Sequence, residues 1–263
     1  MTTALYTRVW RLLVGDVEYA GADLRATARW PQGATGTVDL TVYHPDPAMV
    51  DQLRAGTVRV SVLAGYADAT GSVEIGGGTP VRGSLVYDRS VVDMPLSIQL
   101  SAAGRPASTV LSAAWATVTA REVLAWVARE SGLELDDQSA DDLRYARGYV
   151  LDGGWASVVG SLARDLGCSW DVDGTTLRLW PSDGVSRLSA SLWSSSTGLE
   201  RAAPAGEAGQ IRAVRRLDPA LRPGHLIRLI SDDYAGYVRL LEVVHEIDTA
   251  GDTWTTTAVG SPR

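Results

Sequence analysis

Hydrophobic and polar residues alternate with a period of two along much of the first hundred residues. In TVDLTVY (37–43) every second residue is apolar, the pattern of a strand with one face buried. His44–Pro47 ends this strand, because proline cannot donate to a ladder, and Ala48–Leu53 suits a turn or two of helix. Further strands are predicted at residues 5–14, 17–20, 57–64, 80–87 and 94–102. Short strands separated by Gly, Pro and Asp favour a barrel or sandwich.

Between residues 104 and 181 the apolar spacing becomes helical. Thr119 and Glu122 match a capping box, and the pattern predicts helices over Ala120–Ser131 and Trp155–Leu166, each followed by a terminating glycine. Strands are predicted at 133–135 and 168–172. VARESGLELD (127–136) and LARDLGCSWD (162–171) share Ala, Arg, Gly and Asp at matching positions. Two copies are too few for a solenoid, so we expect two similar units inside one small α+β domain.

The last part of the chain is again β in character. A stretch rich in Ser, Ala and Gly (189–209) comes first, and strands are predicted at 211–214, 225–230, 237–247 and 253–259. The order is therefore β module, α+β insert, β module. We expect a β-rich α+β chain with domains at residues 1–104, 105–185 and 186–263.

Composition narrows the function classes. The net charge of the 263 residues is -7 and there is one cysteine, which disfavours a basic nucleic-acid-binding face and excludes an internal disulfide framework. The first sixteen residues lack the apolar core and cleavage site of a signal peptide. No apolar run approaches the ~20 residues needed to span a bilayer. We expect a soluble protein made in the cytoplasm, with no direct membrane insertion.

Two candidate reactive features lie in residues 168–174. Asp171-Val-Asp173-Gly174 resembles the start of a calcium loop, but TTLRLW follows it and supplies no further oxygen ligand; an Asp-Gly hairpin turn is the prediction. Cys168 follows the end of a helix, where the macrodipole does not lower a thiol pKa. It is predicted to be a buried core residue.

The remaining polar residues form no recognisable constellation. His44, His225 and His245 have no partner at metal-ligand spacing. Gly76–Gly78 lacks the lysine of a phosphate-binding loop and is predicted to be a flexible loop tip. The acidic pairs 136–137, 141–142 and 232–233 are predicted to be solvated in loops, and no G-x-S-x-G elbow occurs. We therefore predict no catalytic, cofactor-binding or metal-binding residue and no enzyme activity.

The aromatic composition is unusual, with nine tryptophans and no phenylalanine. Core filling explains most of the tryptophans. A sugar- or base-stacking platform is the alternative, but the tryptophans do not cluster on one predicted strand face.

Several segments resemble the baseplate (tail) hub proteins of phages and related contractile injection systems. The resemblance extends over nearly the whole chain. It rests on TVDLTVYHPDPAMVDQLRAGTVRVSVLAGYAD (37–68), the strand at 80–87, TAREVLAWVARESGLEL (119–135), GGWASVVGSLARDLGCSWDVDGTTLRL (153–179), STGLERAAP (196–204), LDPALRPGHLIRL (217–229) and VVHEIDTAGDTWTTTAVG (243–260).

The resemblance implies a structural virion protein with two tail-tube-like β-barrels flanking the α+β domain. Such hubs form homotrimers whose six barrels make a pseudo-six-fold ring. The ring joins the tail tube or distal tail protein to the trimeric central spike, with baseplate wedge proteins around it. Tape measure protein and DNA pass through the lumen, which tends to be acidic in the family, so that phosphate does not adhere.

Two alternatives remain open beside the hub. One is a tail-tube or distal-tail adaptor, which would form hexamers. The other is a cell-wall-binding or -degrading tail component, for which the tryptophans are the motive.

Overall fold

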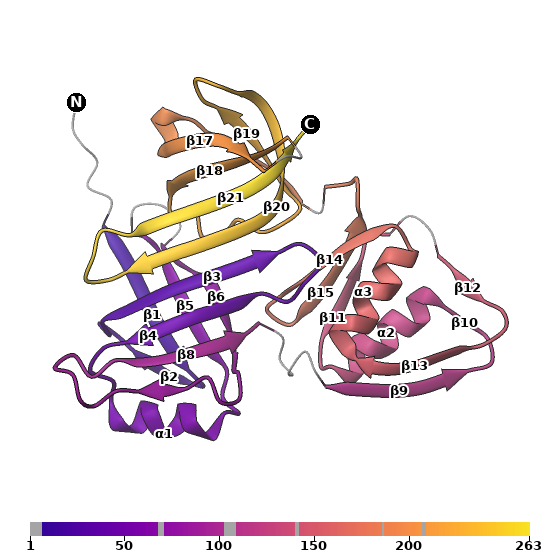
Figure 1. The fold of residues 1–263 in the computed structure, drawn as a ribbon, viewed down its shortest axis with the longest axis horizontal. Helices are drawn as coiled ribbons and strands as arrows, with labels where there is room; N and C mark the ends of the chain where they lie inside the picture. Colours follow the sequence, from indigo (N-terminus) through magenta and orange to yellow (C-terminus); the bar gives the residue numbers. More distant parts are fainter. Residues whose placement is uncertain (1–6, 68–70, 103–108, 140–141, 186, 207–208) are drawn as a thin grey trace.

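The computed structural model describes residues 7–67, 71–102, 109–139, 142–185, 187–206 and 209–263, and strands dominate it (Figure 1). The first β module contains β1 (Arg8–Val14), β2 (Val17–Tyr19), β3 (Leu24–Pro31), β4 (Thr37–Val42), α1 (Pro47–Ala55), β5 (Val60–Tyr66), β6 (Gly71–Pro80), β7 (Val86–Tyr87) and β8 (Leu96–Ser101).

The insert follows in the chain, and the second β module completes it. The insert contains β9 (Val110–Trp115), β10 (Val118–Thr119), α2 (Ala120–Glu130), β11 (Glu134–Asp137), β12 (Arg144–Tyr145), β13 (Tyr149–Gly154), α3 (Trp155–Asp165), β14 (Cys168–Asp173) and β15 (Thr176–Pro181). The second module contains β16 (Arg187–Trp193), the 3-10 turn η1 (Ser195–Thr197), β17 (Leu199–Ala205), β18 (Gln210–Arg216), β19 (His225–Ile230), β20 (Ala235–Asp248) and β21 (Trp254–Pro262). The predicted β-rich α+β class is confirmed.

The helices begin and end where the sequence places their caps. Asp46 accepts a hydrogen bond from the Ala48 amide at the start of α1, and Gly56 ends that helix in the left-handed conformation. In α2 the capping box forms in full, since Glu122 Oε2 accepts from the Thr119 amide at 2.8 Å. The predicted spans of α2 and α3 agree with the observed ones to within one residue.

One fourteen-stranded sheet connects the two β modules. Its main path is β17-β18-β21-β20-β3-β4-β8-β6-β5-β1-β2, with β7 paired to β8 and β19 and β16 branching from β20. The connection between the modules is the antiparallel pair β20–β3, whose register runs from Glu242 opposite Pro31 to Asp248 opposite Arg25. Figure 1 shows β20 and β3 side by side although two hundred residues separate them in the chain.

The hydrophobic interior falls into three clusters. The cluster of the first module also takes in Leu217, Ile247 and Trp254 from the C-terminal part of the chain. The cluster of the second module takes in Trp30 and Ala102. The insert's cluster draws only on residues between 111 and 179. The two β modules therefore exchange core residues across the predicted domain boundaries, whereas the insert packs on itself.

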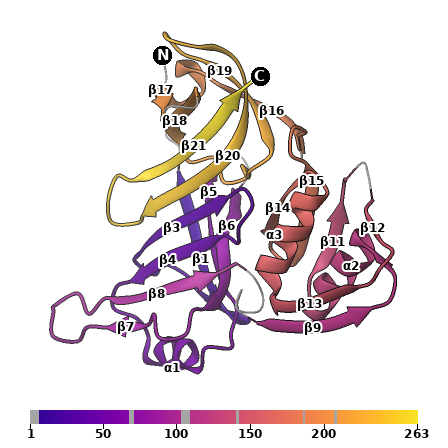
Figure 2. The ribbon, with the colours of Figure 1, turned by 45° about the vertical axis from the view of Figure 1, so that its right-hand side comes forward.

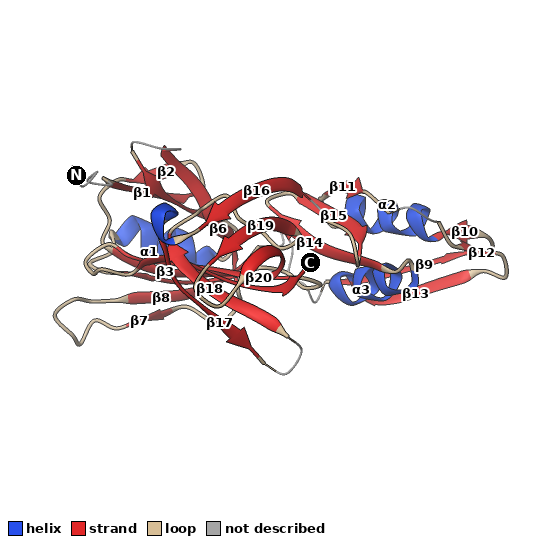
Figure 3. Ribbon diagram, turned by 90° about the horizontal axis from the view of Figure 1, so that it is seen from above, coloured by secondary structure: helices blue, strands red, loops and turns tan. Residues whose placement is uncertain are grey.

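The insert extends to one side of the β modules (Figures 2 and 3). Helices α2 and α3 pack together between a small sheet of order β11-β15-β14 and the two-stranded ribbon β9–β13. The small sheet mixes a parallel pair, β11–β15, with the antiparallel hairpin β14–β15.

Gly76–Gly78 do not form a loop tip, and that prediction is wrong. All three lie buried in strand β6. A Cβ on Gly76 would stand 2.7 Å from Ala28 Cβ, and a Cβ on Gly78 would stand 1.8 Å from the Ser101 carbonyl oxygen. Glycine is present because neighbouring strands approach too closely for a side chain.

Other strand predictions also need correction. The strand expected at 80–87 is instead the end of β6, a turn and the two-residue β7. The soft stretch at 189–209 contains the end of β16, then η1 and β17. Strands β3 and β9 and most of β6 were not predicted. Two of the four buried positions of β3 are Ala26 and Ala28, which carry little hydrophobic signal until a facing sheet covers them.

Candidate functional site

A mostly hydrophilic face crosses both β modules, with Val214, Val244 and Val259 among its polar residues. Strand register aligns its side chains in rows, since residues directly opposite in a ladder share a face. One such row, from β18 to β8, consists of Arg216, Thr255, Glu246, Thr27, Asp39 and Gln99. The residues between these positions on β3, β4 and β8 point inward and are apolar and buried. The continuous sheet thus offers one polar surface with the two cores behind it.

This polar face carries charges of both signs. Arg25 and Asp248 form an ion pair at 2.7 Å, and Arg29 lies 4.0 Å from Glu242. The Asp248 pKa is lowered by its hydrogen bond from Arg25. The face is therefore mixed in charge, and the net charge of -7 is not concentrated on it. Cations already paired with carboxylates attract phosphate less than unpaired ones do.

Arg222 is the residue at which the three parts of the chain meet. It is 5% exposed and precedes β19. Its guanidinium donates to the Glu74 carbonyl of β6 at 2.8 Å and lies 4.5 Å from the ring centroid of Trp30, both in the first module. Its Nε is 3.5 Å from Asp173 Oδ1 on β14 of the insert. No motif in the sequence identifies this residue, because its importance arises only from the contacts of three distant segments.

The two aspartates of the D-x-D-G run belong to this buried junction. Asp173 binds Arg178 at 2.7 Å. Asp171 is 3% exposed, and burial raises its pKa to about 7, opposed by Arg178 and Arg222 and assisted by Asp173 and Asp136. The run is a hairpin as predicted, although pairing continues to Asp173 and Thr176, so the two loop residues are Gly174 and Thr175. The sequence missed the burial of Asp171 and the ion pairs of Asp173, which is half-buried.

The three histidines have different environments. His245 is fully buried on β20, with Nδ1 2.9 Å from Thr256 Oγ1 and Nε2 3.2 Å from the Leu221 carbonyl. Burial lowers the pKa of His245 to about 3 and that of His225 to about 4. Both are neutral at pH 7, which is what buried hydrogen-bonded imidazoles require. His44 is exposed, 4.0 Å from Asp93.

The other candidate residues are scattered. Cys168 is buried in the insert's cluster, as predicted. Asp136 and Asp137 lie in β11 and not in a loop, and Asp137 pairs with Arg121 at 3.0 Å. Asp142 is exposed, and Asp141 lies outside the described residues. Asp232 and Asp233 are exposed in the β19–β20 turn, as predicted.

Within the part of the chain that the structure describes, no three His, Cys, Asp or Glu side chains stand where they could hold one metal ion. Among the described helices none is long and apolar enough to cross a bilayer.

The aromatic residues fall into two groups. Trp30, Trp155, Trp180 and Trp193 are fully buried. A second, half-buried group brings together Trp115, Trp126, Tyr145 and Tyr149 from four elements of the insert. The rings of Trp115 and Trp126 meet edge to face with centroids 5.4 Å apart. This cluster spans a helix and three strands and does not lie on one strand face.

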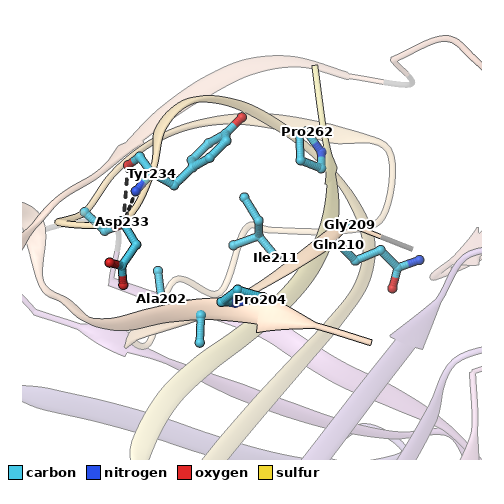
Figure 4. Close-up of a pocket in the computed structure, with 10 residues that line it drawn as sticks. Ala202, Pro204, Gly209, Gln210, Ile211, Asp233, Tyr234 and Pro262 are labelled. Carbon is cyan, nitrogen blue, oxygen red and sulfur yellow. Dashed lines mark hydrogen bonds between the residues drawn. The ribbon is translucent and has the colours of Figure 1, made fainter. Parts of the chain in front are cut away.

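An apolar groove opens at the far end of the second module (Figure 4). Its volume is about 250 Å³, and it lies between the edge strand β17 and the β19–β20 turn. Ala202, Pro204, Ile211 and Tyr234 face it, with Pro262 at its rim.

No family model matches the chain, and no curated protein resembles it in sequence. Solved structures do share its fold. A type VI secretion system component of E. coli, described as similar to the T4 tail proteins gp27 and gp5, has a TM-score of 0.68 at 12% identity over 96% of this chain and 76% of that one. A 43 kDa prophage tail protein of Shewanella oneidensis has a TM-score of 0.68 at 10% identity over 97% and 98%. A chain of the Francisella PdpA–VgrG complex has a TM-score of 0.66 at 6% identity over 98% and 58%.

These similarities extend along almost the whole chain, insert included, and at such low identity they define the fold. The chain has the fold of phage tail and secretion-system spike proteins. The resemblance inferred from the sequence motifs is confirmed at that level.

Proposed function

We propose that the protein is the structural hub of a phage tail baseplate or a related injection particle. Three copies form a ring of six β modules that joins the tail tube or distal tail protein to a trimeric central spike. The insert of each copy lies outside the ring and contacts the surrounding baseplate wedge proteins. The residue divisions 1–104, 105–185 and 186–263 describe these parts.

The observation that carries this proposal is the continuous sheet. Because β20 pairs with β3, both modules of one chain share a polar face backed by two cores. Such a face can line a channel while exposing little apolar surface. Two modules in one chain also convert three-fold to pseudo-six-fold symmetry, which an adaptor between a hexameric tube and a trimeric spike requires.

We propose that this face lines the lumen through which tape measure protein and DNA pass. The lumen proposed here differs from the acidic lumen expected for the family, because this face carries side chains of both charges. Paired arginines and short hydroxyl side chains would keep DNA from adhering here.

Assembly in the absence of the chain tests the hub directly. Particles made without it should lack spike and baseplate, and averaged images of complete tails should show three-fold density at its position. Six-fold density would identify a tail-tube or distal-tail adaptor instead. Intact infectious tails without the chain would refute both.

A second candidate is cell-wall binding or degradation through the insert, favoured by the aromatic cluster around Trp115 and Trp126. Pull-down with purified cell-wall glycan and zymography of the full chain separate it from the hub. Binding that is lost in Trp115→Ala and Trp126→Ala, or hydrolysis that is lost on replacing one carboxylate, would support it.

A further inference from the structure

The first module carries a basic groove at one corner. The groove has a volume of about 1070 Å³ and lies between the end of α1 and the β6–β7 loop, beside the edge strand β7. Arg54 and Arg82 are the charged residues in its lining, and both are exposed. Asp51, one turn earlier on α1, lies 3.6 Å from Arg54 in an exposed pair that contributes little.

The same corner exposes apolar side chains. Val81 and Leu85 line the groove, and Val86 on β7 is 62% exposed. An apolar patch with basic residues beside it is typical of a surface that another protein covers.

The far end of the second module is acidic, in contrast to the basic groove of the first module. Its β19–β20 turn projects Asp232 and Asp233, closed by hydrogen bonds between Ser231 and Tyr234. Beside the turn lie the apolar groove of Figure 4 and the edge strand β17. On the neighbouring sheet face Ile230 and Tyr237 are exposed. This end is therefore acidic at its tip and apolar around it.

We infer that these two surfaces bind each other between copies of the chain, with the acidic β19–β20 turn of one copy seated in the basic groove of the next. The inference rests on the proposed ring and names the contact that closes it. Charge complementarity selects a second copy as the occupant, because acid faces base and apolar faces apolar.

The contact has to be intermolecular. Figures 1 and 2 both place the β19 end of the second module and helix α1 at opposite ends of the molecule. Two different surfaces in contact make a head-to-tail interface, which closes into a ring when the rotation permits. Among the described residues β7 pairs only with β8 and β17 only with β18, so the contact also covers two open sheet edges.

Side chains carry more of this contact than a backbone ladder does. Pro204 in β17 lacks a donor, and β7 has only two residues. The charges are therefore the feature to change in a test.

Charge reversal tests the inference on the full chain. Arg54→Glu with Arg82→Glu gives both surfaces the same sign, and so does Asp232→Lys with Asp233→Lys. Each double variant should reduce the fraction of chains in rings by about tenfold or more, because like charges across an interface cost several kcal/mol. The variant with all four changes should restore it. Arg129→Glu with Arg164→Glu, the same charge change on exposed helices of the insert, should leave it unchanged.

A cross-link supplies a second measurement. Arg82→Cys together with Asp233→Cys should give disulfide-linked species that end at three chains. Cys168 is buried, and the groove beside α1 and the β19 end of the second module lie at opposite ends of one molecule, so the two new thiols of one chain do not join each other. Either single cysteine variant should give no such series.

The outcomes separate the two proposals. Rings that form equally well in the reversed variants, or cross-links that do not form in rings, overturn the inferred contact and leave the hub intact. A wild-type chain that makes no ring, either in concentrated solution or in assembled tails, overturns both. Six-chain closure would support the contact but replace the three-fold hub by a six-fold adaptor.

Discussion

The two β modules are joined to each other differently from the way the insert is joined to them. Strands β3 and β20 share an antiparallel ladder from Arg25 to Pro31, and the cores on both sides exchange residues. The insert has a closed core of its own. Apart from its two chain connections, a few polar contacts hold it. The Gly33 amide donates to the Trp170 carbonyl at 2.8 Å, Gln32 donates to Ser169 at 2.6 Å, and Arg222 pairs with Asp173.

This difference predicts that the two β modules hold a fixed orientation to each other, whereas the insert is attached less rigidly. A backbone ladder with apolar residues behind it opens only when the strands themselves unfold, whereas side-chain contacts open locally at lower cost. A surface that spans both modules therefore keeps its curvature, as the channel wall proposed above would require. The insert can reorient relative to that surface without disturbing it.

Removing a shared core residue gives the largest expected effect. Trp254 on β21 is buried in the first module's cluster and meets Trp10 edge to face, with centroids 6.2 Å apart. Trp254→Ala should lower the free energy of unfolding by about 3–5 kcal/mol. Urea unfolding with hydrogen exchange should show that residues of both β modules lose protection together. Trp126→Ala, at a half-buried site on the insert, is the control and should leave the β modules unaffected. Loss of protection confined to the second module would contradict the idea of one fused body.

Removing the junction arginine should weaken the attachment of the insert. Arg222→Met keeps a long side chain but leaves buried Asp171 and half-buried Asp173 without one of their cations, and breaking a fully buried pair costs about 3–5 kcal/mol in general. Asp173 remains paired with Arg178 at 2.7 Å, so we expect the variant to lose about 3 kcal/mol in its free energy of unfolding, the lower end of that range. Hydrogen exchange should accelerate at the β14–β15 hairpin and around β6. Arg129→Met on α2 is the matched control. Unchanged exchange at the hairpin would show that the chain connections alone position the insert.

The protonation of Asp171 should make the stability of this junction depend on pH. Between pH 4 and 7 the native carboxyl holds a proton that the unfolded chain releases, because burial raises its pKa from 3.8 to about 7. Its contribution to stability is therefore present below pH 4 and is lost as the pH rises to about 7. The lowered pKa values of His225 and His245 act in the opposite direction in both proteins and cancel in a comparison.

Asp171→Asn isolates this effect. Relative to wild type, the variant should gain stability as the pH rises from 4 to 7, by about 3 kcal/mol, because each pKa unit corresponds to about 1.4 kcal/mol. The weaker contact of the amide with Arg178 displaces the whole curve and leaves this pH dependence unchanged. Urea midpoints at a series of pH values measure it. Asp142→Asn, at an exposed site, should show no such trend. Parallel curves for Asp171→Asn and wild type would mean that Asp171 is ionised throughout.

The sequence predicted the parts of the fold that local physics determines. Helix ends at Thr119 and Gly132 follow from capping chemistry, and the hairpin at Gly174 follows from its positive φ. Strands built from small residues were missed. In β6 the small residues are glycines, and they are needed because Ala28 and Ser101 approach the strand closely. This close approach is visible only in the folded sheet.

The candidate surfaces, like the missed strands, depend on contacts between distant segments that local sequence does not specify. Asp171 and Arg222 each look unremarkable in the chain, and their burial depends on segments more than forty residues apart meeting at one point. The polar sheet face likewise requires the register of β20 against β3, which no local pattern specifies. Motif order still predicted the fold, because that order survives when the individual residues have diverged.

The smallest expected effect concerns a surface contact on the ladder that joins the β modules. Arg25 and Asp248 pair at 2.7 Å across β3 and β20, but the arginine side chain is 61% exposed. Arg25→Ala should therefore lower the free energy of unfolding by only about 0.5 kcal/mol, and less at high salt. Asp248 keeps its bonds from the amides of Ala250 and Gly251. Urea midpoints at low and high salt, beside those of Trp254→Ala, measure this contrast. A loss as large as that of Trp254→Ala would mean that surface charge, and not the ladder and its shared cores, holds the two modules together.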